Sequence, residues 1–244
     1  MNSKGSYFFL DGVRIPFSEG DSILTAAQRE KYYIPHLCFH PSVSAHGSCR
    51  LCTVKLDGHW VAACTQPAKP LIQVTSNSPE LDKKRLRLIQ LLFAEGNHYC
   101  PSCEISGNCQ LQALAYDLGM THYHFPPLYP TRSQDGTHPD LFIDQDRCIY
   151  CGLCERTSNQ LDGKDTMALS GRGSTTKLIF NSSSGKMGDT LANSHDQLAH
   201  ICPVGCILNK KGNYSTAIGQ RHYDHTPIHV IGNLRPEQKN HEPD

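Results

Sequence analysis

The start of the chain alternates between hydrophobic and polar residues. Residues 6–17 read SYFFLDGVRIPF, and the alternation turns around at Asp11-Gly12. A period of two is typical of a half-buried strand, and Asp-Gly between two such runs is a strong signal for a two-residue hairpin. A second hairpin is predicted around Asp57-Gly58, and LIQVTS after it predicts a further strand.

In the segment between the two hairpins, the apolar residues recur at helical spacing instead of alternating. ILTAAQREKY follows two residues suited to an N-cap, Asp21 and Ser22, and predicts a helix to about residue 32. Two hairpins, one helix and one more strand within about 75 residues, with cysteines in the connecting loops, describe a small α+β domain.

Two further helices are predicted beyond this domain. Ser78 and Pro79 open the longer one, because serine is a good N-cap and proline is tolerated at the first helical position. Its apolar stripe runs through ELDKKRLRLIQLLFAEG, and Gly96 is suited to the C-cap. A short helix is predicted from Gln110 to Leu118, where Gly119 stops it.

The pattern weakens after residue 120. Residues 121–140 are rich in proline and polar residues and predict an extended connector. LFIDQDRC and KLIF predict two short strands, separated by the polar, loop-forming stretches SGRGSTT and NSSSGKMGDT. The last thirty residues, 215–244, are too polar to form a core of their own. We expect a tail that either lies on a partner or is partly disordered.

Composition and charge narrow the class of protein. Twelve of the 244 residues are cysteine, yet a chain of this length is longer than the small domains that depend on disulfides. The N-terminus lacks an apolar segment of signal-peptide length, and no window approaches the ~20 apolar residues of a membrane helix. We therefore expect a soluble, cytoplasmic protein with reduced thiols. The 23 basic and 23 acidic residues balance, which leaves no basic footprint for nucleic acid.

The cysteines fall into three groups, each with a C-x2-C pair that brings two thiolates of one loop onto a common centre. The first group is Cys38, Cys49, Cys52 and Cys64; the second is Cys100, Cys103 and Cys109, with His98 just before; the third is Cys148, Cys151, Cys154, Cys202 and Cys206. The triple C-I-Y-C-G-L-C in the third group favours an iron–sulfur cluster over a zinc ion.

The third group predicts a module with a single cluster. A two-cluster run would carry another cysteine after three intervening residues, at the position where this chain has Ser158. The fourth ligand must therefore come from elsewhere, and Cys202, followed by Pro203, is the best candidate. Cys206 is then left over, and we interpret it as a small buried apolar residue.

Together, these motifs resemble the N-terminal part of the large iron–sulfur subunit of respiratory complex I. C-x10-C-x2-C-x11-C resembles its two-iron ferredoxin domain, EGNHYCPSCEISGNCQLQ its histidine–three-cysteine cubane motif, and CIYCGLC…ICPVG its single-cubane ferredoxin module. The resemblance covers about residues 5–214. Because this chain stops soon after the last motif, it is most similar to the small iron–sulfur (diaphorase) subunits of bidirectional NAD-reducing nickel–iron hydrogenases.

The resemblance implies an α+β fold in five parts and three clusters. A β-grasp two-iron ferredoxin domain would occupy residues 1–78, a helical segment with a His/Cys3 [4Fe-4S] site 79–120, a connector 121–140, a bacterial-ferredoxin-like [4Fe-4S] domain 141–214, and an extended tail 215–244. We expect one [2Fe-2S] cluster and two [4Fe-4S] clusters. No G-x-G-x-x-G follows a strand, so we expect no flavin or NAD on this chain.

The resemblance also implies the ligands. They would be Cys38, Cys49, Cys52 and Cys64 for [2Fe-2S]; His98, Cys100, Cys103 and Cys109 for one [4Fe-4S]; and Cys148, Cys151, Cys154 and Cys202 for the other. The family motif places three residues between its histidine and its first cysteine, whereas this chain places one between His98 and Cys100. His98 could therefore be a neighbour of the cluster instead, with His122 or His124 folding back as the ligand.

Sites closed by four protein ligands can transfer electrons but cannot bind a substrate. We therefore expect no catalytic residue, and a chain that acts as a non-catalytic subunit of a hydrogen:NAD⁺ oxidoreductase. It would relay electrons between a flavin/NAD(H)-binding partner and the hydrogenase small subunit, and through that to the large nickel–iron subunit. Two alternatives remain: the equivalent subunit of an NAD-dependent formate dehydrogenase, and a zinc-binding structural protein.

Overall fold

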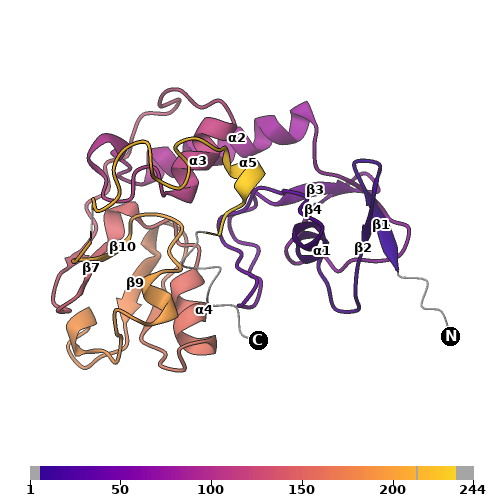
Figure 1. Ribbon diagram of the computed structural model, residues 1–244. Helices are drawn as coiled ribbons and strands as arrows, with labels where there is room; N and C mark the ends of the chain where they lie inside the picture. The colour runs from indigo at the N-terminus through magenta and orange to yellow at the C-terminus, as the bar shows by residue number, and fades with distance from the viewer. Residues whose placement is uncertain (1–5, 213, 235–244) are drawn as a thin grey trace.

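The computed structural model describes residues 6–212 and 214–234. Its N-terminal part is a five-stranded sheet with one helix against it (Figure 1). The strands, in the order β2-β1-β5-β3-β4, are β2 (Val13–Pro16), β1 (Tyr7–Leu10), β5 (Gln73–Thr75), β3 (Thr53–Leu56) and β4 (His59–Ala62). β1 and β5 are parallel, and the other neighbouring pairs are antiparallel.

Both predicted hairpins are confirmed. Asp11 and Asp57 have φ of +49° and +45°, and the glycine after each also has a positive φ. A two-residue hairpin with both central residues at positive φ twists in the same sense as its strands, which is why Asp-Gly is favoured there. The predicted third run is confirmed as β5, which lies between the two hairpins and joins them into one sheet.

The first helix, α1, runs over Ile23–Arg29, and Ser22 caps it by accepting a hydrogen bond from the Thr25 N–H at 3.0 Å. It ends earlier than predicted because Lys31 takes a left-handed conformation with φ of +59°. Its buried face, including Leu24 and Ala27, shares one hydrophobic core with Phe8 of β1.

The long helix is confirmed as α2 (Pro79–Glu95), which begins at the predicted cap, Ser78, and ends at Gly96. The next elements are a 3-10 turn, η1 (Cys100–Ser102), and α3 (Gln110–Asp117). The side chain of Arg85 is 4% exposed and donates hydrogen bonds to the carbonyl groups of Leu51 and Thr53. This contact docks α2 against the loop that carries the first cysteine group.

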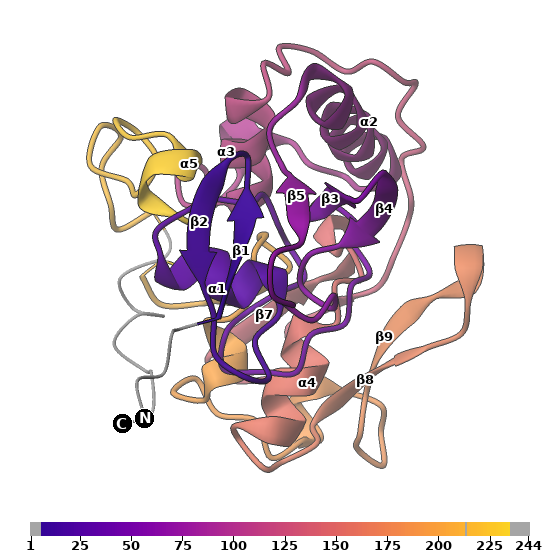
Figure 2. The ribbon, with the colours of Figure 1, turned by 90° about the vertical axis from the view of Figure 1, so that its right-hand side faces the viewer.

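The C-terminal half is built on a second, three-stranded sheet. β7 (Leu141–Asp144) lies between β10 (Ile207–Asn209) and β6 (Gln134–Asp135), and all pairs are antiparallel. α4 (Leu153–Gln160) follows, and then the hairpin of β8 (Met167–Ser170) and β9 (Lys177–Phe180), which extends away from the other elements (Figure 2). The 3-10 turns are η2 (Gln145–Arg147), η3 (Gly173–Thr175), η4 (Met187–Asp189) and η5 (Gln197–Ala199).

The predicted strands in LFIDQDRC and KLIF are confirmed as β7 and β9. The connector at residues 121–140 is largely irregular, as predicted, although it contributes β6 to the second sheet. No pattern in the sequence predicted α4, β8 or β10, because these short elements become regular through pairing and burial more than through their own pattern.

Residues 214–234 of the tail are ordered against the rest of the chain, and residues 235–244 lie outside the described residues, so a contact of the tail with a partner or a partly disordered end stays a prediction. Its short helix α5 (Ile228–Ile231) buries Ile228 in the same hydrophobic core as Ile89 of α2 and Leu114 of α3. The N–H of Tyr223 donates to the Gly107 carbonyl at 2.9 Å. This part of the tail therefore packs on its own chain, and Figure 1 shows it crossing above the second sheet toward α3.

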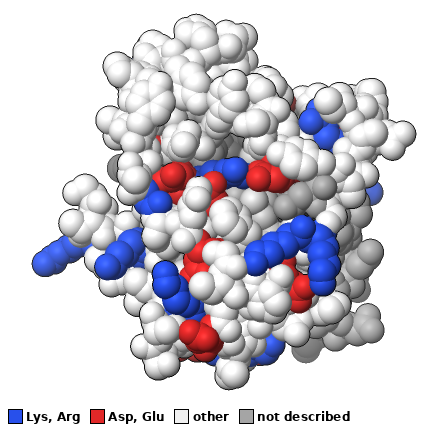
Figure 3. Space-filling view, turned by 90° about the vertical axis from the view of Figure 1, so that its left-hand side faces the viewer, with Lys and Arg blue, Asp and Glu red and all other residues white. Residues whose placement is uncertain are grey.

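The surface carries no broad field of one charge on the face drawn in Figure 3, where Lys and Arg side chains alternate with Asp and Glu. This interspersion agrees with the balanced composition. Among the described residues, no helix is long and apolar enough to span a membrane.

Candidate iron–sulfur sites

The first group gathers where three loops of the N-terminal sheet meet. Cys38 follows α1, Cys49 and Cys52 precede β3, and Cys64 follows β4. The thiol of Cys38 is within hydrogen-bonding contact of the thiols of Cys49 and Cys64, and Cys64 also contacts Cys52. The N–H of Cys49 donates to Cys38 Sγ at 3.4 Å. All four predicted thiols are therefore brought to one place.

These thiol contacts shift the pKa values in opposite directions. Hydrogen bonds from neighbouring thiols lower the pKa of Cys38 and Cys52, and the same contacts, together with burial, raise the pKa of Cys49 and Cys64. Binding of a metal centre by all four sulfurs as thiolates would release their protons, which is the usual coupling between metal binding and ionisation.

The second group lies around the 3-10 turn η1. Cys100 begins this turn, Cys103 ends it, and Cys109 stands at the N-cap of α3. His98 and all three cysteines line one small cavity. The Nε2 atom of His98 is buried and has no hydrogen-bond partner in the described part of the chain. Burial, followed by the charges of Arg132 and Arg147, lowers the pKa of His98 to about 4, which keeps the imidazole neutral.

A neutral imidazole with a buried, unpartnered nitrogen beside three thiols fits a metal ligand. The family spacing, with three residues between the histidine and the first cysteine, would place the histidine at position 96, where this chain has Gly96. The missing side chain there leaves room for the imidazole of His98. A Cβ at Gly96 would lie only 2.3 Å from His98 Nε2. The imidazole of His98 therefore occupies the space that a side chain at position 96 would enter. His122 and His124, the two alternatives, are both exposed.

The third group combines the loop before α4, the first turn of α4 and the loop before β10. Cys148, Cys151, Cys154 and Cys202 are close enough for their charges to influence one another. Gly152 takes a left-handed conformation with φ of +67° as it turns the chain into α4. The N–H of Tyr150 donates to Cys148 Sγ at 3.4 Å, a main-chain contact of the kind that steadies a metal-binding thiolate.

The interpretation of Cys206 as a buried residue agrees with its exposure of 2%. The sequence did not predict which groups the thiol of Cys206 contacts. It is within hydrogen-bonding contact of the thiols of Cys148 and Cys202, which makes it a fifth thiol at this site. The only available signal was its spacing of four residues from Cys202.

The third group lies against the first group. Cys38 of the first group and Cys151 of the third share a small hydrophobic cluster with Val43, Leu153 and Ile201. The side chain of Gln160 in α4 also hydrogen-bonds the N–H and the hydroxyl of Ser44, which belongs to the loop between Cys38 and Cys49. Residues more than 100 positions apart in the sequence thus form one contact region.

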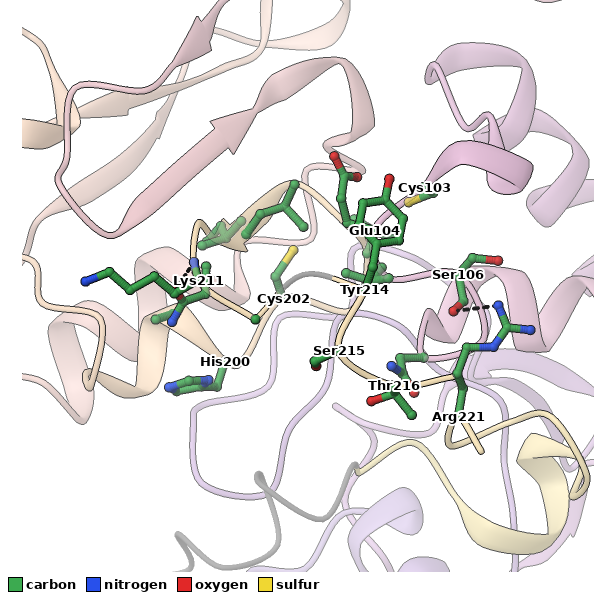
Figure 4. A pocket seen from close by; sticks show the side chains of 18 of the residues that line it. Cys103, Glu104, Ser106, His200, Cys202, Lys211, Tyr214, Ser215, Thr216 and Arg221 are labelled. Carbon is green, nitrogen blue, oxygen red and sulfur yellow. Dashed lines mark hydrogen bonds between the residues drawn. The ribbon is translucent and has the colours of Figure 1, made fainter. Parts of the chain in front are cut away.

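The third group also lies against the second. Cys103 and Cys202 line a cavity of about 380 Å³, which the segment after β10 covers with Tyr214, Ser215 and Thr216 (Figure 4). The hydroxyl of Tyr214 donates to the Ser102 carbonyl at 2.8 Å. Cys109 of the second group and Cys202 of the third are also buried in the same hydrophobic core, so the group that comes last in the sequence is in contact with both of the others. No three His, Cys, Asp or Glu side chains of the described residues converge as they would on a single metal ion.

Three family models match the chain. Residues 7–79 match a 2Fe-2S iron–sulfur cluster binding domain, residues 85–124 match the NADH-ubiquinone oxidoreductase-G iron–sulfur binding region, and residues 141–208 match a 4Fe-4S single cluster domain. Each match contains the whole of one cysteine group.

Several known proteins are similar over most of the chain. The gamma subunit of the NAD-reducing hydrogenase HoxS of Cupriavidus necator is 37% identical over 221 residues, which cover 88% of this chain and 92% of that subunit. The NADH-ubiquinone oxidoreductase 75 kDa subunit of Reclinomonas americana is 28% identical over 83% of this chain, but only 29% of that subunit is covered. A chain in the crystal structure of an NAD⁺-reducing [NiFe]-hydrogenase in its H2-reduced state superposes with a TM-score of 0.90 and 48% identity, covering 93% and 97% of the two chains.

Proposed function

The chain belongs to the family of gamma, iron–sulfur subunits of NAD-reducing [NiFe]-hydrogenases, and on that premise we propose that it relays single electrons through three iron–sulfur clusters. The observation that supports this most directly is the contact of the third cysteine group with both other groups. A relay needs neighbouring redox sites, and the fold brings the three groups together.

We propose the ligand sets as four residues for each cluster. They are Cys38, Cys49, Cys52 and Cys64 for [2Fe-2S]; His98, Cys100, Cys103 and Cys109 for one [4Fe-4S]; and Cys148, Cys151, Cys154 and Cys202 for the other. The first set is supported by contacts among its thiols, the second by the shared cavity and the unpartnered Nε2 of His98, and the third by mutual electrostatic influence.

The parts of the chain follow from these sets. We propose a two-iron ferredoxin domain at 1–78, a His/Cys3 segment at 79–120, a connector at 121–140, a ferredoxin-like domain at 141–214 and a tail at 215–244. The mixed sheet with a parallel β1–β5 pair and α1 against it supports a β-grasp fold for the first domain.

The four-ligand sets leave no position for a substrate, so this chain would have no active site of its own. A cluster held by such a set supplies one-electron chemistry. The residues of this chain would hold the clusters, keep them apart from water and set their potentials. The partners at the two ends of the relay would be a flavin- and NAD-binding subunit and the hydrogenase small subunit, which leads to the nickel–iron subunit.

The order of the sites in space supports a route that differs from the order in the sequence. We propose that electrons pass between the first group and the second group by way of the third. Placement in the hydrogenase family favours this complex over the formate dehydrogenase alternative, and subunits that co-purify with the full chain would identify the complex directly.

Metal analysis of the purified full chain, prepared without oxygen, tests the proposal. We expect about ten irons and about ten sulfides per chain, which is the sum for one two-iron and two four-iron clusters. The protein should be brown and should give EPR signals when reduced. A colourless protein with zinc in place of iron would overturn the proposal and would support the zinc-binding alternative.

A further inference from the structure

The side chain of Arg147 reaches from the third cysteine group to the second. Arg147 is the last residue of η2 and directly precedes Cys148, a member of the third group. Its guanidinium lines the cavity of the second group, and Nη1 donates a hydrogen bond to Cys103 Sγ at 3.6 Å. A single residue thus touches the second site through its side chain and is bonded to the third through its main chain.

Two carboxylates hold the guanidinium in this position. Nε of Arg147 lies 2.8 Å from Oδ2 of Asp144, and Nη1 forms an ion pair with Glu104. The side chains of Arg147, Asp144 and Glu104 are only 19%, 6% and 22% exposed, so water screens this network less than it screens a surface pair.

Gly205 provides the room for this contact. A Cβ at Gly205 would lie 3.3 Å from both Arg147 Nη1 and Cys103 Sγ, which is tighter than an ordinary contact. The glycine lies between Cys202 and Cys206, so the loop of the third group is shaped to let the guanidinium approach the thiol of the second.

We propose that Arg147 is a positioning residue that sets the reduction potential of the His98, Cys100, Cys103 and Cys109 site. Reduction adds negative charge to a site, and a nearby cation with a hydrogen bond to a ligand sulfur makes that addition more favourable. Because Glu104 compensates part of the positive charge, the two residues act in opposite directions. The inference rests on the proposed ligation of this site.

The opposite signs give a sharp test in the full chain, with each cluster's midpoint measured by EPR-monitored redox titration. Arg147→Gln removes the cation and leaves Asp144 and Glu104 uncompensated, so the midpoint of the His98 site should fall. Glu104→Gln leaves the guanidinium without one counter-charge, so the midpoint should rise. We expect each change to be about tenfold in the reduced-to-oxidised ratio, or about 59 mV for one electron.

Three controls complete the design. Arg147→Lys keeps the charge and should keep most of the midpoint. Arg87→Gln, on the exposed face of α2, should change no midpoint, and the [2Fe-2S] midpoint serves as an internal reference in every variant. If Arg147→Gln loses its cluster, Glu104→Gln, which retains the guanidinium, still carries the test.

Unchanged midpoints in cluster-loaded variants, or shifts of the same sign in Arg147→Gln and Glu104→Gln, would overturn the role of Arg147. These outcomes leave the proposed function standing. An unaltered chain without iron would instead overturn the proposed function itself, and iron and sulfide analysis of each sample distinguishes the two failures.

Discussion

The main-chain carbonyl groups of Cys38 and Cys151 accept hydrogen bonds from the same atom, Nη2 of Arg156, at 2.9 and 3.0 Å. Cys38 belongs to the first cysteine group and Cys151 to the third. Arg156 also donates to the carbonyl groups of Ser44 and Gly152. One guanidinium in α4 therefore ties together the two loops that carry these groups.

Arg156→Ala should lower the free energy of unfolding by about 2 kcal/mol, because several carbonyl groups lose a charged donor at once. It should also weaken the magnetic coupling between the first and third clusters, measured by pulsed EPR on the reduced full chain. Arg156→Lys should recover little, since one ammonium cannot replace a fork with five donors. Stability and coupling equal to those of the unaltered chain would show that Arg156 does not hold the loops.

Replacing His98 should change the potential of the second site. His98→Cys exchanges a neutral imidazole for an anionic thiolate, so reduction becomes harder and the midpoint falls. His98→Ala should remove or alter the EPR signal of that cluster. His122→Ala is the matched control, because His122 is exposed and should leave the signal intact. An unaltered signal in His98→Ala would remove His98 from the ligand set.

The two cysteines of ICPVGC should behave differently. Cys202→Ala removes a proposed ligand and should reduce the iron content from about ten to about six per chain. Cys206→Ala should retain all of the iron, since its thiol contacts the site as a fifth sulfur. The converse pattern, with iron lost only from Cys206→Ala, would exchange the two assignments. Iron retained in both single variants and lost in the double variant would show that either cysteine can serve.

The tail should stabilise the chain through Asn233. Its side chain is 4% exposed, and Nδ2 donates to the His36 carbonyl at 2.7 Å and to Gln110 Oε1 at 2.9 Å. Asn233→Ala leaves both acceptors without this donor, at a cost of about 1–3 kcal/mol. Thermal unfolding of the full chain measures the loss, and Val230→Ala, at an exposed position of α5, should cost much less. Equal losses in the two variants would rule out a specific role.

Stability at alkaline pH should depend on Tyr32. Partial burial, followed by the hydrogen bond to Asp11 and the charge of Asp11, raises the pKa of Tyr32 from 10.0 to about 12. The folded state then holds this proton more tightly than the unfolded state, so the contribution is complete below pH 10 and is lost as the pH approaches 12. Because the ring is partly exposed, we expect at most about 1 kcal/mol.

Tyr32→Phe measures this contribution. The advantage of the unaltered chain over Tyr32→Phe in thermal midpoint should be constant at neutral pH and should shrink between about pH 10 and about pH 12. A difference that stays the same over that range would contradict the assigned pKa.

Local signals in the sequence were sufficient for much of the fold. The hairpins at Asp11-Gly12 and Asp57-Gly58 were predicted because positive φ at both central residues is a requirement within two residues. The start of α2 at Ser78 was predicted because a cap acts within one turn. By contrast, α4 and β10 have weak patterns and depend on pairing and burial by distant segments, so their existence was not evident.

The candidate sites also have some features that were predicted from local sequence and others that depend on distant segments. The spacing of the cysteines was enough to predict which of them share a loop, because a C-x2-C pair places two thiols together whatever the rest of the chain does. The contact of the third group with both of the others, the direction of the Cys206 thiol and the approach of Arg147 to Cys103 became evident from the fold. Those relationships depend on which loops meet when the core closes, and hydrophobic burial is non-directional, so no short spacing in the sequence encodes them.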